Sequence, residues 1–429
     1  MKKVLAILLI LVMVLGLFAA CGNGETETPD PVAPAPPANG GDDNGDEEPE
    51  PATGEPLLIG AIASLSGALQ DYGEQFQRGF ILGLEYMTNG TNTVAGRPIE
   101  VIWEDTTTTP AVAAERTLVL LERNVEIVAG FTATGDALAS LALFEEFETV
   151  VVIEPAAGDG IIQYPNWNEF VFRTGRTSGQ DALAMLDVLS YRYPDGGATV
   201  GAIAPDTTFG YAMVEPFVEA AEARGFEVVS VEYIPPDATD HTAFILRTRE
   251  AAPDYLYVIW AGANNPWNQL MELDMPGAGI TIITGAPELE ALYAMRPLGY
   301  IGGIGFCVYY YDLPQGEPMN EWLIQRHFED FGVQPDIFVS GGMAAASAAI
   351  TALELTGGVT DPAVLIPTMR GMEFNSPTGM RWFRAEDHQA MQVLFEVEFT
   401  APEGVGHMVP RWVRTIPAET LIPPIMNQP

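Results

Sequence analysis

The sequence is short of basic residues. Its 429 residues include 19 lysines and arginines against 58 aspartates and glutamates, so the formal net charge at pH 7 is −39. The lysines are Lys2 and Lys3, and all the other residues of this basic group are arginines. A surface this acidic repels polyanions, which excludes nucleic acid and anionic lipid as partners. The imbalance says nothing about the fold.

Cysteine and histidine are scarce as well. Cys21 and Cys307 are too few for a disulfide framework or a thiolate zinc site. The four histidines are scattered and lack the spacing that metal ligands need. The sequence has no G-x-S-x-G elbow, no P-loop and no G-x-G-x-x-G fingerprint. We therefore expect no metal, no cofactor and no enzymatic activity.

The N-terminus has the pattern of an export signal. Lys2 and Lys3 precede the apolar run 4–17, and small residues stand directly before Cys21. Small residues ahead of a cysteine resemble the bacterial lipoprotein box. The resemblance implies that residues 1–20 are a removed signal peptide and that acylated Cys21 anchors the chain in the cell membrane, facing the extracytoplasmic side. The alternative is a transmembrane helix, for which this run is barely long enough.

Residues 21–56 differ in composition from the rest of the chain. From Gly22 onward they are rich in proline, glycine and alanine, and they contain ten acidic residues and no base. Such a segment cannot bury enough apolar surface to form a core. We interpret it as a linker between the anchor and the globular part; a specific acidic binding tail is the alternative.

From residue 57 onward, short apolar runs alternate with helical patterns. Continuous apolar runs typical of buried parallel strands occur at 57–64, 98–105, 126–131, 149–154, 198–205, 226–233, 255–260 and 280–284. Between them, residues 72–87 and 110–123 have helical patterns. Two series of strand–helix alternation, separated near 172–178, predict an α/β protein with two doubly wound parallel-sheet lobes. The length and the 48% hydrophobic content agree with a large globular core.

Short motifs accompany these strands in a fixed order. They are Ile59-Gly60-Ala61, Ser64-Leu65-Ser66-Gly67, Tyr72-Gly73, Gly130-Phe131-Thr132, Pro155-Ala156-Ala157, Phe172-Arg173-Thr174, Asp206-Thr207-Thr208-Phe209-Gly210, Pro287-Glu288, Gly379 and the runs 384–392 and 414–419. In order and spacing they resemble the type I periplasmic binding proteins of branched-chain amino acid, amide and urea transporters, the leucine-binding-protein-like family. The resemblance extends from about Pro56 to the C-terminus.

The resemblance implies two lobes joined by a three-crossing hinge, with a ligand cleft between the lobes. We expect the crossings near 174–179, 306–310 and 373–379. The predicted limits are 57–175 plus 308–375 for lobe 1 and 176–307 plus 376–429 for lobe 2. The carboxyl ends of the strands in such sheets open into a crevice where ligands bind.

The helix that follows Gly130 is the strongest candidate for an anion site. Thr132 and Thr134 offer hydroxyl groups, and Gly135 allows a ligand to approach the free backbone amides. We predict that this helix N-terminus holds a ligand carboxylate. The alternative is that the threonines only cap the helix.

Three further positions match the family's binding residues. The resemblance implies that Tyr72 covers the ligand, and that the backbone carbonyl of Ala156 accepts a hydrogen bond from the ligand ammonium. Glu288 is implied to pair with the same ammonium group. The alternative is a solvated glutamate, which is usual for an isolated residue, but its position at the end of the strand ITIITGAPE favours the site.

Three other positions depart from the family pattern. Gly158 stands where amino-acid binders often have threonine, Asn264 where leucine-type binders have tyrosine, and Phe209 in place of another family aromatic. The backbone-forming motifs of the site therefore match the family, while the side chains that would contact the ligand differ at these three positions. We include these residues in the predicted site, and the departures weaken any assignment to leucine.

Together these features predict a lipid-anchored, extracytoplasmic solute-binding protein of an ABC importer. We expect a monomer that captures a small amino-acid-like ligand and delivers it to permease subunits in the membrane. A ligand-sensing module of the same fold, docking on a receptor or sensor kinase, is the alternative, because fold and site would be shared. The sequence leaves the ligand open among aliphatic amino acids, amides, urea-like compounds and aromatic acids.

Overall fold

The computed structural model describes residues 54–262, 264–299 and 303–428. The predicted signal peptide, the predicted lipidation site Cys21 and nearly all of the predicted linker lie outside these residues.

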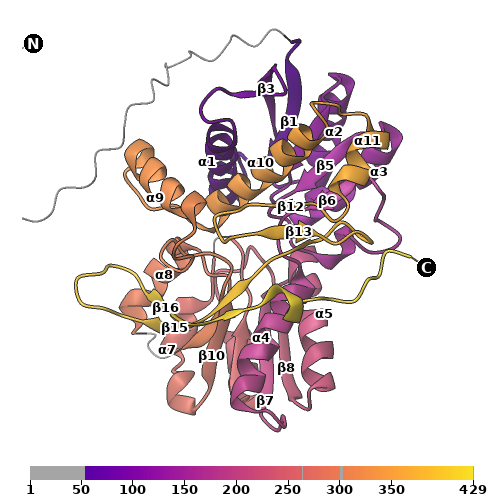
Figure 1. The fold of residues 1–429 in the computed structure, drawn as a ribbon. Coiled ribbons are helices and arrows are strands. Elements are labelled where there is room, and N and C mark those ends of the chain that lie inside the picture. The colour runs from indigo at the N-terminus through magenta and orange to yellow at the C-terminus, as the bar shows by residue number, and fades with distance from the viewer. Residues whose placement is uncertain (1–53, 263, 300–302, 429) are drawn as a thin grey trace, which may run out of the picture. The chain divides into compact units, whose positions relative to one another are not determined.

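The first sheet contains strands from the N-terminal half of the described chain, in the order β2-β3-β1-β4-β5-β6. Figure 1 labels β1, β3, β5 and β6 of this sheet. Its strands are β1 Leu57–Ala63, β2 Thr93–Val94, β3 Arg97–Asp105, β4 Ile127–Gly130, β5 Val150–Ile153 and β6 Val171–Arg173. The short β2 is antiparallel to β3, and the other pairs are parallel. Helices α1 Gln70–Met87, α2 Pro110–Glu122 and α3 Thr134–Glu146 and the 3-10 turn η1 Asp159–Ile161 connect them. All four residues of β5, VVVI, are buried, as expected for a parallel strand covered on both faces.

The second sheet has the order β16-β15-β11-β10-β9-β7-β8 among the described residues. Its strands are β7 Thr199–Pro205, β8 Glu227–Ile234, β9 Tyr255–Val258, β10 Thr281–Gly285, β11 Ile304–Cys307, β15 Leu394–Thr400 and β16 Val409–Ile416. Its helical elements are α4 Ser178–Arg192, α5 Thr208–Ala223, α6 Thr242–Ala251, α7 Trp267–Glu272, η2 Pro276–Ala278, α8 Leu289–Met295 and η3 Arg296–Leu298. Strands β7 to β11 are parallel, whereas β15 and β16 add an antiparallel edge.

The remaining elements follow β11. They are α9 Pro318–Phe331, α10 Ile337–Leu355, α11 Pro362–Met369, β12 Glu373–Phe374, β13 Arg381–Phe383, β14 Ala390–Met391 and the turn η4 Ala418–Thr420. Strands β12, β13 and β14 form a small antiparallel sheet. The C-terminal half of α10 packs in the same apolar core as the first sheet, so the chain returns there after β11.

This architecture confirms the predicted fold class, two α/β lobes with mainly parallel sheets. We use first lobe for the first sheet with its helices and second lobe for the second sheet with its helices. The residue limits of the lobes stay a prediction. Phe383 and Ala390, which the predicted limits assign to lobe 2, pack in the apolar core of the first sheet.

Helices α1 and α10 lie side by side at very close range (Figure 1). A Cβ atom added at Gly79 of α1 would lie 1.9 Å from the carbonyl oxygen of Val339, and one added at Gly83 would lie 2.7 Å from Cβ of Ala346. Helix α10 is long and apolar enough to cross a membrane by length and composition, but 89% of its most apolar window is buried inside the protein. It is therefore the core helix of the first lobe.

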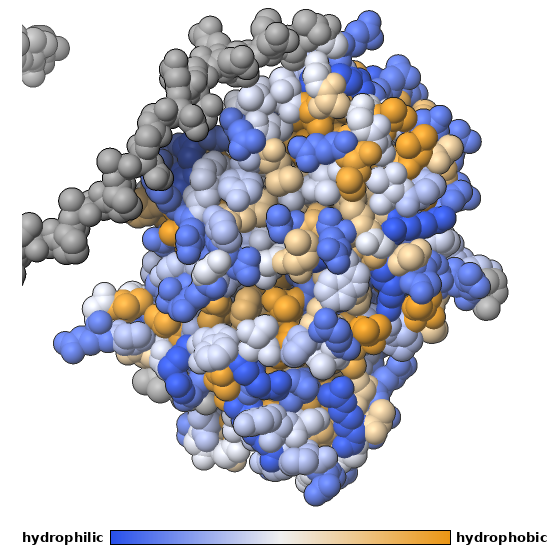
Figure 2. Space-filling view, viewed as in Figure 1, coloured by the Kyte–Doolittle hydropathy of each residue, from blue (hydrophilic) through white to orange (hydrophobic). Residues whose placement is uncertain are grey.

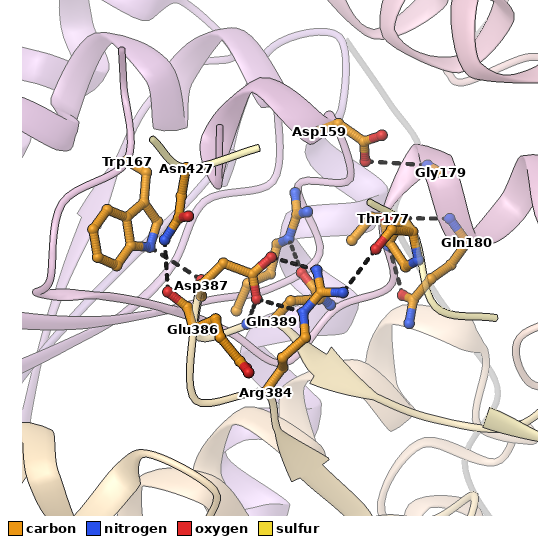
Figure 3. A network of polar contacts seen from close by, with 12 residues as sticks. Asp159, Trp167, Thr177, Gly179, Gln180, Arg384, Glu386, Asp387, Gln389 and Asn427 are labelled. Atoms are coloured by element: carbon orange, nitrogen blue, oxygen red, sulfur yellow. Dashed lines mark hydrogen bonds and ion pairs between the residues drawn. The ribbon is translucent and has the colours of Figure 1, made fainter. Parts of the chain in front are cut away.

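The C-terminal segment that follows η4 is tied to the loop before β14 by polar contacts (Figure 3). Arg384 donates to the carbonyl oxygen of Pro423 at 2.7 Å and pairs with Asp387. The side-chain amide of Asn427 donates to the carbonyl oxygen of Glu386 at 2.6 Å. Because β16 belongs to the second sheet, this segment connects the second lobe with the small sheet.

The face of the molecule in Figure 2 is mostly hydrophilic, with hydrophobic residues scattered between polar ones. Hydrophobic residues exposed singly are normal on a protein surface and need no partner to cover them. This face therefore does not indicate a docking site of its own.

Replacing Gly79 tests the close packing of α1 on α10. We expect Gly79→Ala to lower the free energy of unfolding by about 1 to 3 kcal/mol, because overpacking outweighs the better helix propensity of alanine. Chemical denaturation checks this result. Gly160→Ala is the control, since its added Cβ would have no neighbour closer than 3.8 Å. Equal stability of both variants would contradict the packing argument.

Candidate functional site

Tyr72, in the first turns of α1, links the two lobes through its hydroxyl group. The hydroxyl donates a hydrogen bond to Oε1 of Glu288 at 3.2 Å and accepts one from the backbone amide of Gly262 at 3.1 Å. Its ring lies against that of Phe338, with centroids 4.2 Å apart. Tyr72 is buried, with 8% of its surface exposed. Two predicted site residues that lie 216 positions apart in the chain therefore meet.

Glu288 lies at the N-cap of α8, and the N-cap of α10, Asp336, lies next to it. The two carboxylate oxygens of Asp336 accept hydrogen bonds from the amides of Leu289 at 2.9 Å and Ile337 at 2.8 Å, so Asp336 joins the starts of both helices. Burial, with the nearby charge of Asp336 as a further cause, raises the pKa of Glu288 to about 7. Burial also raises the pKa of Asp336 to about 6.

Sequence reasoning missed Asp336. An aspartate directly before a long apolar helix indicates an N-cap, and this signal was available. No pattern in the chain indicated that the second carboxylate oxygen would reach the helix that starts beside Glu288, because this contact spans 47 residues.

The start of α3 brings together Thr132, Thr134 and Gly158. Oγ1 of Thr134 accepts a hydrogen bond from the amide of Gly158 at 3.1 Å, and Oγ1 of Thr132 accepts one from the amide of Ser64 at 3.0 Å. A Cβ atom at position 158 would lie 2.3 Å from Cγ2 of Thr134. The side chain of Thr134 therefore occupies the space that a threonine side chain at position 158 would need. This explains why position 158 is a glycine in this chain.

The first turn of α3 also carries a buried carboxyl group, Asp136, with 1% of its surface exposed. Burial raises the pKa of Asp136 to about 6. When ionised, this group opposes the positive end of the helix dipole, on which the predicted anion site depends. Gly135, beside it, is half-buried.

Ala156 and Gly158 lie over a buried arginine. Nη1 of Arg173 donates to the carbonyl oxygen of Gly158 at 2.7 Å and lies 3.5 Å from that of Ala156. Nε of Arg173 donates to Gln389 at 2.6 Å. Burial lowers the pKa of Arg173 to about 10, which still leaves it charged at neutral pH. The Ala156 carbonyl, predicted to accept from a ligand ammonium, thus already faces a cation.

Two non-glycine residues next to the site adopt a left-handed backbone. Phe131 has a φ of 71° directly after β4, and Ala286 has a φ of 51° directly after β10. Such conformations cost energy and cluster at functional sites. Phe131 directly precedes Thr132, and Ala286 directly precedes Pro287-Glu288. Their backbone conformations therefore determine the direction in which the chain leaves β4 and β10 toward the predicted site.

Phe209 and Asn264 are not brought to the Tyr72–Glu288 contact by any interaction between described residues. Phe209 lies in the first turn of α5 and packs, half-buried, against the core of the second lobe. Asn264 is exposed, and its side-chain amide donates to the carbonyl oxygen of Pro236 at 3.3 Å.

A pocket of about 840 Å³ lies between α3, η1, α4, α5 and the C-terminal segment. Thr134 is the one predicted site residue in its described lining, which also includes Asp159, Gly179 and Tyr211. Tyr72 and Glu288 do not line it. The pocket therefore adjoins the predicted site at the start of α3.

Among the residues that the structure describes, no group of three or more histidine, cysteine, aspartate or glutamate side chains could hold a metal ion. Cys307 is buried, which raises the pKa of its thiol.

Comparison with known proteins identifies the family. The sequence model of the periplasmic binding proteins matches residues 56–402. A solved ABC-type branched-chain amino acid transporter protein from Rhodopseudomonas palustris is 36% identical, with a TM-score of 0.76 over 87% of this chain and 100% of its own. A solute-binding protein from Rhodopseudomonas palustris BisB5, solved with 3,4-dihydroxybenzoic acid, is 23% identical, with a TM-score of 0.74 over 85% and 98% of the two chains. "Leu/Ile/Val-binding protein homolog 6" of Brucella abortus is 22% identical over 338 residues, 75% of this chain and 82% of its own. The chain belongs to the periplasmic binding protein family, as its two-lobe fold and its motifs predict.

Proposed function

We propose that this chain is the solute-binding protein of an ABC importer and that it captures a small amino-acid-like solute between its lobes. The contact of Tyr72 with Glu288 carries the proposal, because it joins an element of each lobe at the carboxyl ends of the strands. Named relatives that are parts of ABC transporters support the transport role. Delivery to permease subunits and action as a monomer belong to the same proposal.

The acidic groups at this contact favour a solute with an ammonium group. No described basic side chain forms an ion pair with Glu288 or Asp336. Asp336 is buried and Glu288 half-buried. A desolvated carboxylate without a cation is unfavourable, and a ligand ammonium would supply the missing charge through a charge-assisted hydrogen bond. Binding such a solute would displace the proton that the raised pKa of Glu288 favours.

The N-terminal features add a location. We propose that acylated Cys21 anchors the protein in the cell membrane and that the acidic segment up to residue 56 links this anchor to the lobes.

Glu288→Gln tests the ammonium site. A thermal-shift screen of amino acids, amides, urea-like compounds and aromatic acids first identifies a solute, since saturating ligand stabilises the folded protein. For a solute with an ammonium group, we expect Glu288→Gln to weaken binding by about 30-fold or more, because the ammonium is left desolvated and unpaired. Isothermal calorimetry measures the affinity.

The exposed neighbour Glu290 provides the matched control, and Glu290→Gln should bind like the unaltered protein. An affinity of Glu288→Gln within about threefold of the unaltered protein would show that Glu288 does not bind the ammonium. If only neutral amides or aromatic acids bind, Glu288 does not bind a ligand ammonium, but the proposed solute-binding function is not contradicted.

The raised pKa of Glu288 predicts how stability depends on pH. Its ordinary pKa is 4.5 and its pKa in the folded, solute-free protein is about 7, so the folded state binds more protons between these values. Stability should therefore fall as pH rises from 5 to 8, by up to about 3 kcal/mol from this group. Thermal unfolding at both pH values should show a smaller fall in Glu288→Gln than in Glu290→Gln. An equal fall in both variants would contradict the burial of Glu288 in the solute-free protein.

Cys21→Ala tests the anchor. We expect this variant to lose metabolic labelling with a fatty acid, because the thiol that receives the acyl chain is gone, and to be retained as precursor or released from the membrane. Cys307→Ala is the control, since the Cys307 thiol is buried. Unchanged labelling of Cys21→Ala would refute the lipoprotein assignment.

A further inference from the structure

Arg176 lies in the passage from β6 to α4, where the chain runs from the first sheet to the second. Its Nε donates to a carboxylate oxygen of Asp181 at 3.1 Å. The side chain of Asp181 is fully buried, whereas 11% of the Arg176 side chain is exposed. The pair therefore has a buried acidic end and a basic end that reaches solvent.

The terminal nitrogens of Arg176 have spare hydrogen-bonding capacity. Its one hydrogen bond within the described chain is the Nε bond to Asp181. Two other arginines lie nearby, Arg173 at the end of β6 and Arg381 at the start of β13, and both are almost completely buried. Nη2 of Arg173 has no partner among the described residues, but it is sealed from solvent. Arg381 uses all three of its nitrogens on Thr174, Ser376 and Thr378. A guanidinium carries five donors in a rigid fork, so Arg176 can hold Asp181 and a second anion at once.

Groups from both lobes surround Arg176. On the first lobe, its charge counteracts the rise that burial causes in the pKa of Glu154, which directly follows β5. On the second lobe, burial and the charge of Asp181 raise the pKa of the Tyr257 hydroxyl of β9, and the charge of Arg176 lowers it. The Tyr257 hydroxyl would lie 3.0 Å from a Cβ atom added at Gly285, the last residue of β10. Arg176 is thus at the carboxyl ends of strands from both sheets, where this fold binds its ligands.

The start of α3 is poorly suited to hold the solute's anionic group by itself. The Thr134 hydroxyl accepts from the Gly158 amide and keeps its own proton to donate, but the first turn of α3 contains the buried Asp136. A ligand anion would meet a like charge there, which costs affinity. At Arg176 an anion meets a cation that already offsets the charge of Asp181 and whose terminal nitrogens have no partner among the described residues.

We propose that Arg176 binds a carboxylate of the solute through its terminal nitrogens while its Nε stays on Asp181. This assignment rests on the proposed solute-binding function and adds a specificity-determining residue to it. It makes an organic acid the preferred substrate class over the matching amide. Arg176, and not the start of α3, then provides most of the binding energy for that carboxylate.

Matched acids and amides provide the test, namely l-leucine with l-leucinamide and benzoate with benzamide, all measured by calorimetry. For the unaltered protein, the acid of at least one pair should bind and its amide should bind at least about 10-fold more weakly, since a charged hydrogen bond to a largely buried guanidinium is lost. The double variant Arg176→Gln with Asp181→Asn avoids an unpaired buried charge. It should bind the acid about 30-fold or more weakly and the amide unchanged.

Two further variants separate binding from folding. Arg176→Lys keeps the charge without the planar fork, so it should bind the acid with an affinity between those of the unaltered protein and the double variant. Arg192→Gln, at the opposite end of α4, is the control: Arg192 also pairs with a fully buried carboxylate, Glu396, at 2.8 Å. This control should bind the acid normally.

The outcomes distinguish this assignment from the function on which it rests. An amide that binds as tightly as its acid, or a double variant within about threefold of the unaltered protein, overturns the role of Arg176 and leaves solute binding intact. Failure of every compound to bind the unaltered protein overturns the proposed solute class, and the assignment of Arg176 with it.

Discussion

Arg173 and Arg381 bring buried guanidinium groups into the region where the chain passes between the two sheets. Arg173 holds the carbonyl of Gly158 and the side chain of Gln389, and Arg381 holds the carbonyl of Thr174 at 2.9 Å. Neither group forms an ion pair among the described residues, so hydrogen bonds to oxygen atoms offset part of the cost of burying their charges. Because their partners come from segments far apart in the sequence, these two groups fix the loops that end β5 and β6 relative to the small sheet.

The acidic groups at the Tyr72–Glu288 contact also lack an ion-pair partner among the described residues. Glu288 bonds to the Tyr72 hydroxyl and Asp336 to two backbone amides, and neither has a basic partner among the described residues. Burial raises the pKa of both, so the solute-free protein favours their neutral forms more than water does. A cationic group would stabilise the charged forms, and the Tyr72 hydroxyl and two backbone amides already hold the carboxyl groups of Glu288 and Asp336 in place. Such preorganisation reduces the cost of ordering the site on binding.

Individual predicted residues show how far local patterns reach. The apolar runs 98–105 and 149–154 became β3 and β5 with ends displaced by about one residue, as is common for strand boundaries. The glycine at 158 was recognised as a departure from the family, but its cause is the methyl group of Thr134, which lies 24 positions away. The assignment of Tyr72 and Glu288 to one ligand site depended on family resemblance, since no periodic pattern connects residues so far apart.

The sequence by itself determined the α/β alternation, the two lobes and the family, because continuous apolar strands and helical periodicity are local properties of the chain. It also identified Tyr72 and Glu288 through matching motifs. Only the tertiary structure decided which charges are paired. Asp336 accepts a hydrogen bond from the start of α8, and Arg173 lies close to the Ala156 carbonyl. The terminal nitrogens of Arg176 have no partner within the described chain, and Arg176 lies at the carboxyl ends of strands from both sheets. These relations arise from how distant strand ends converge and how much water each group loses on folding, and neither quantity is encoded in a local pattern.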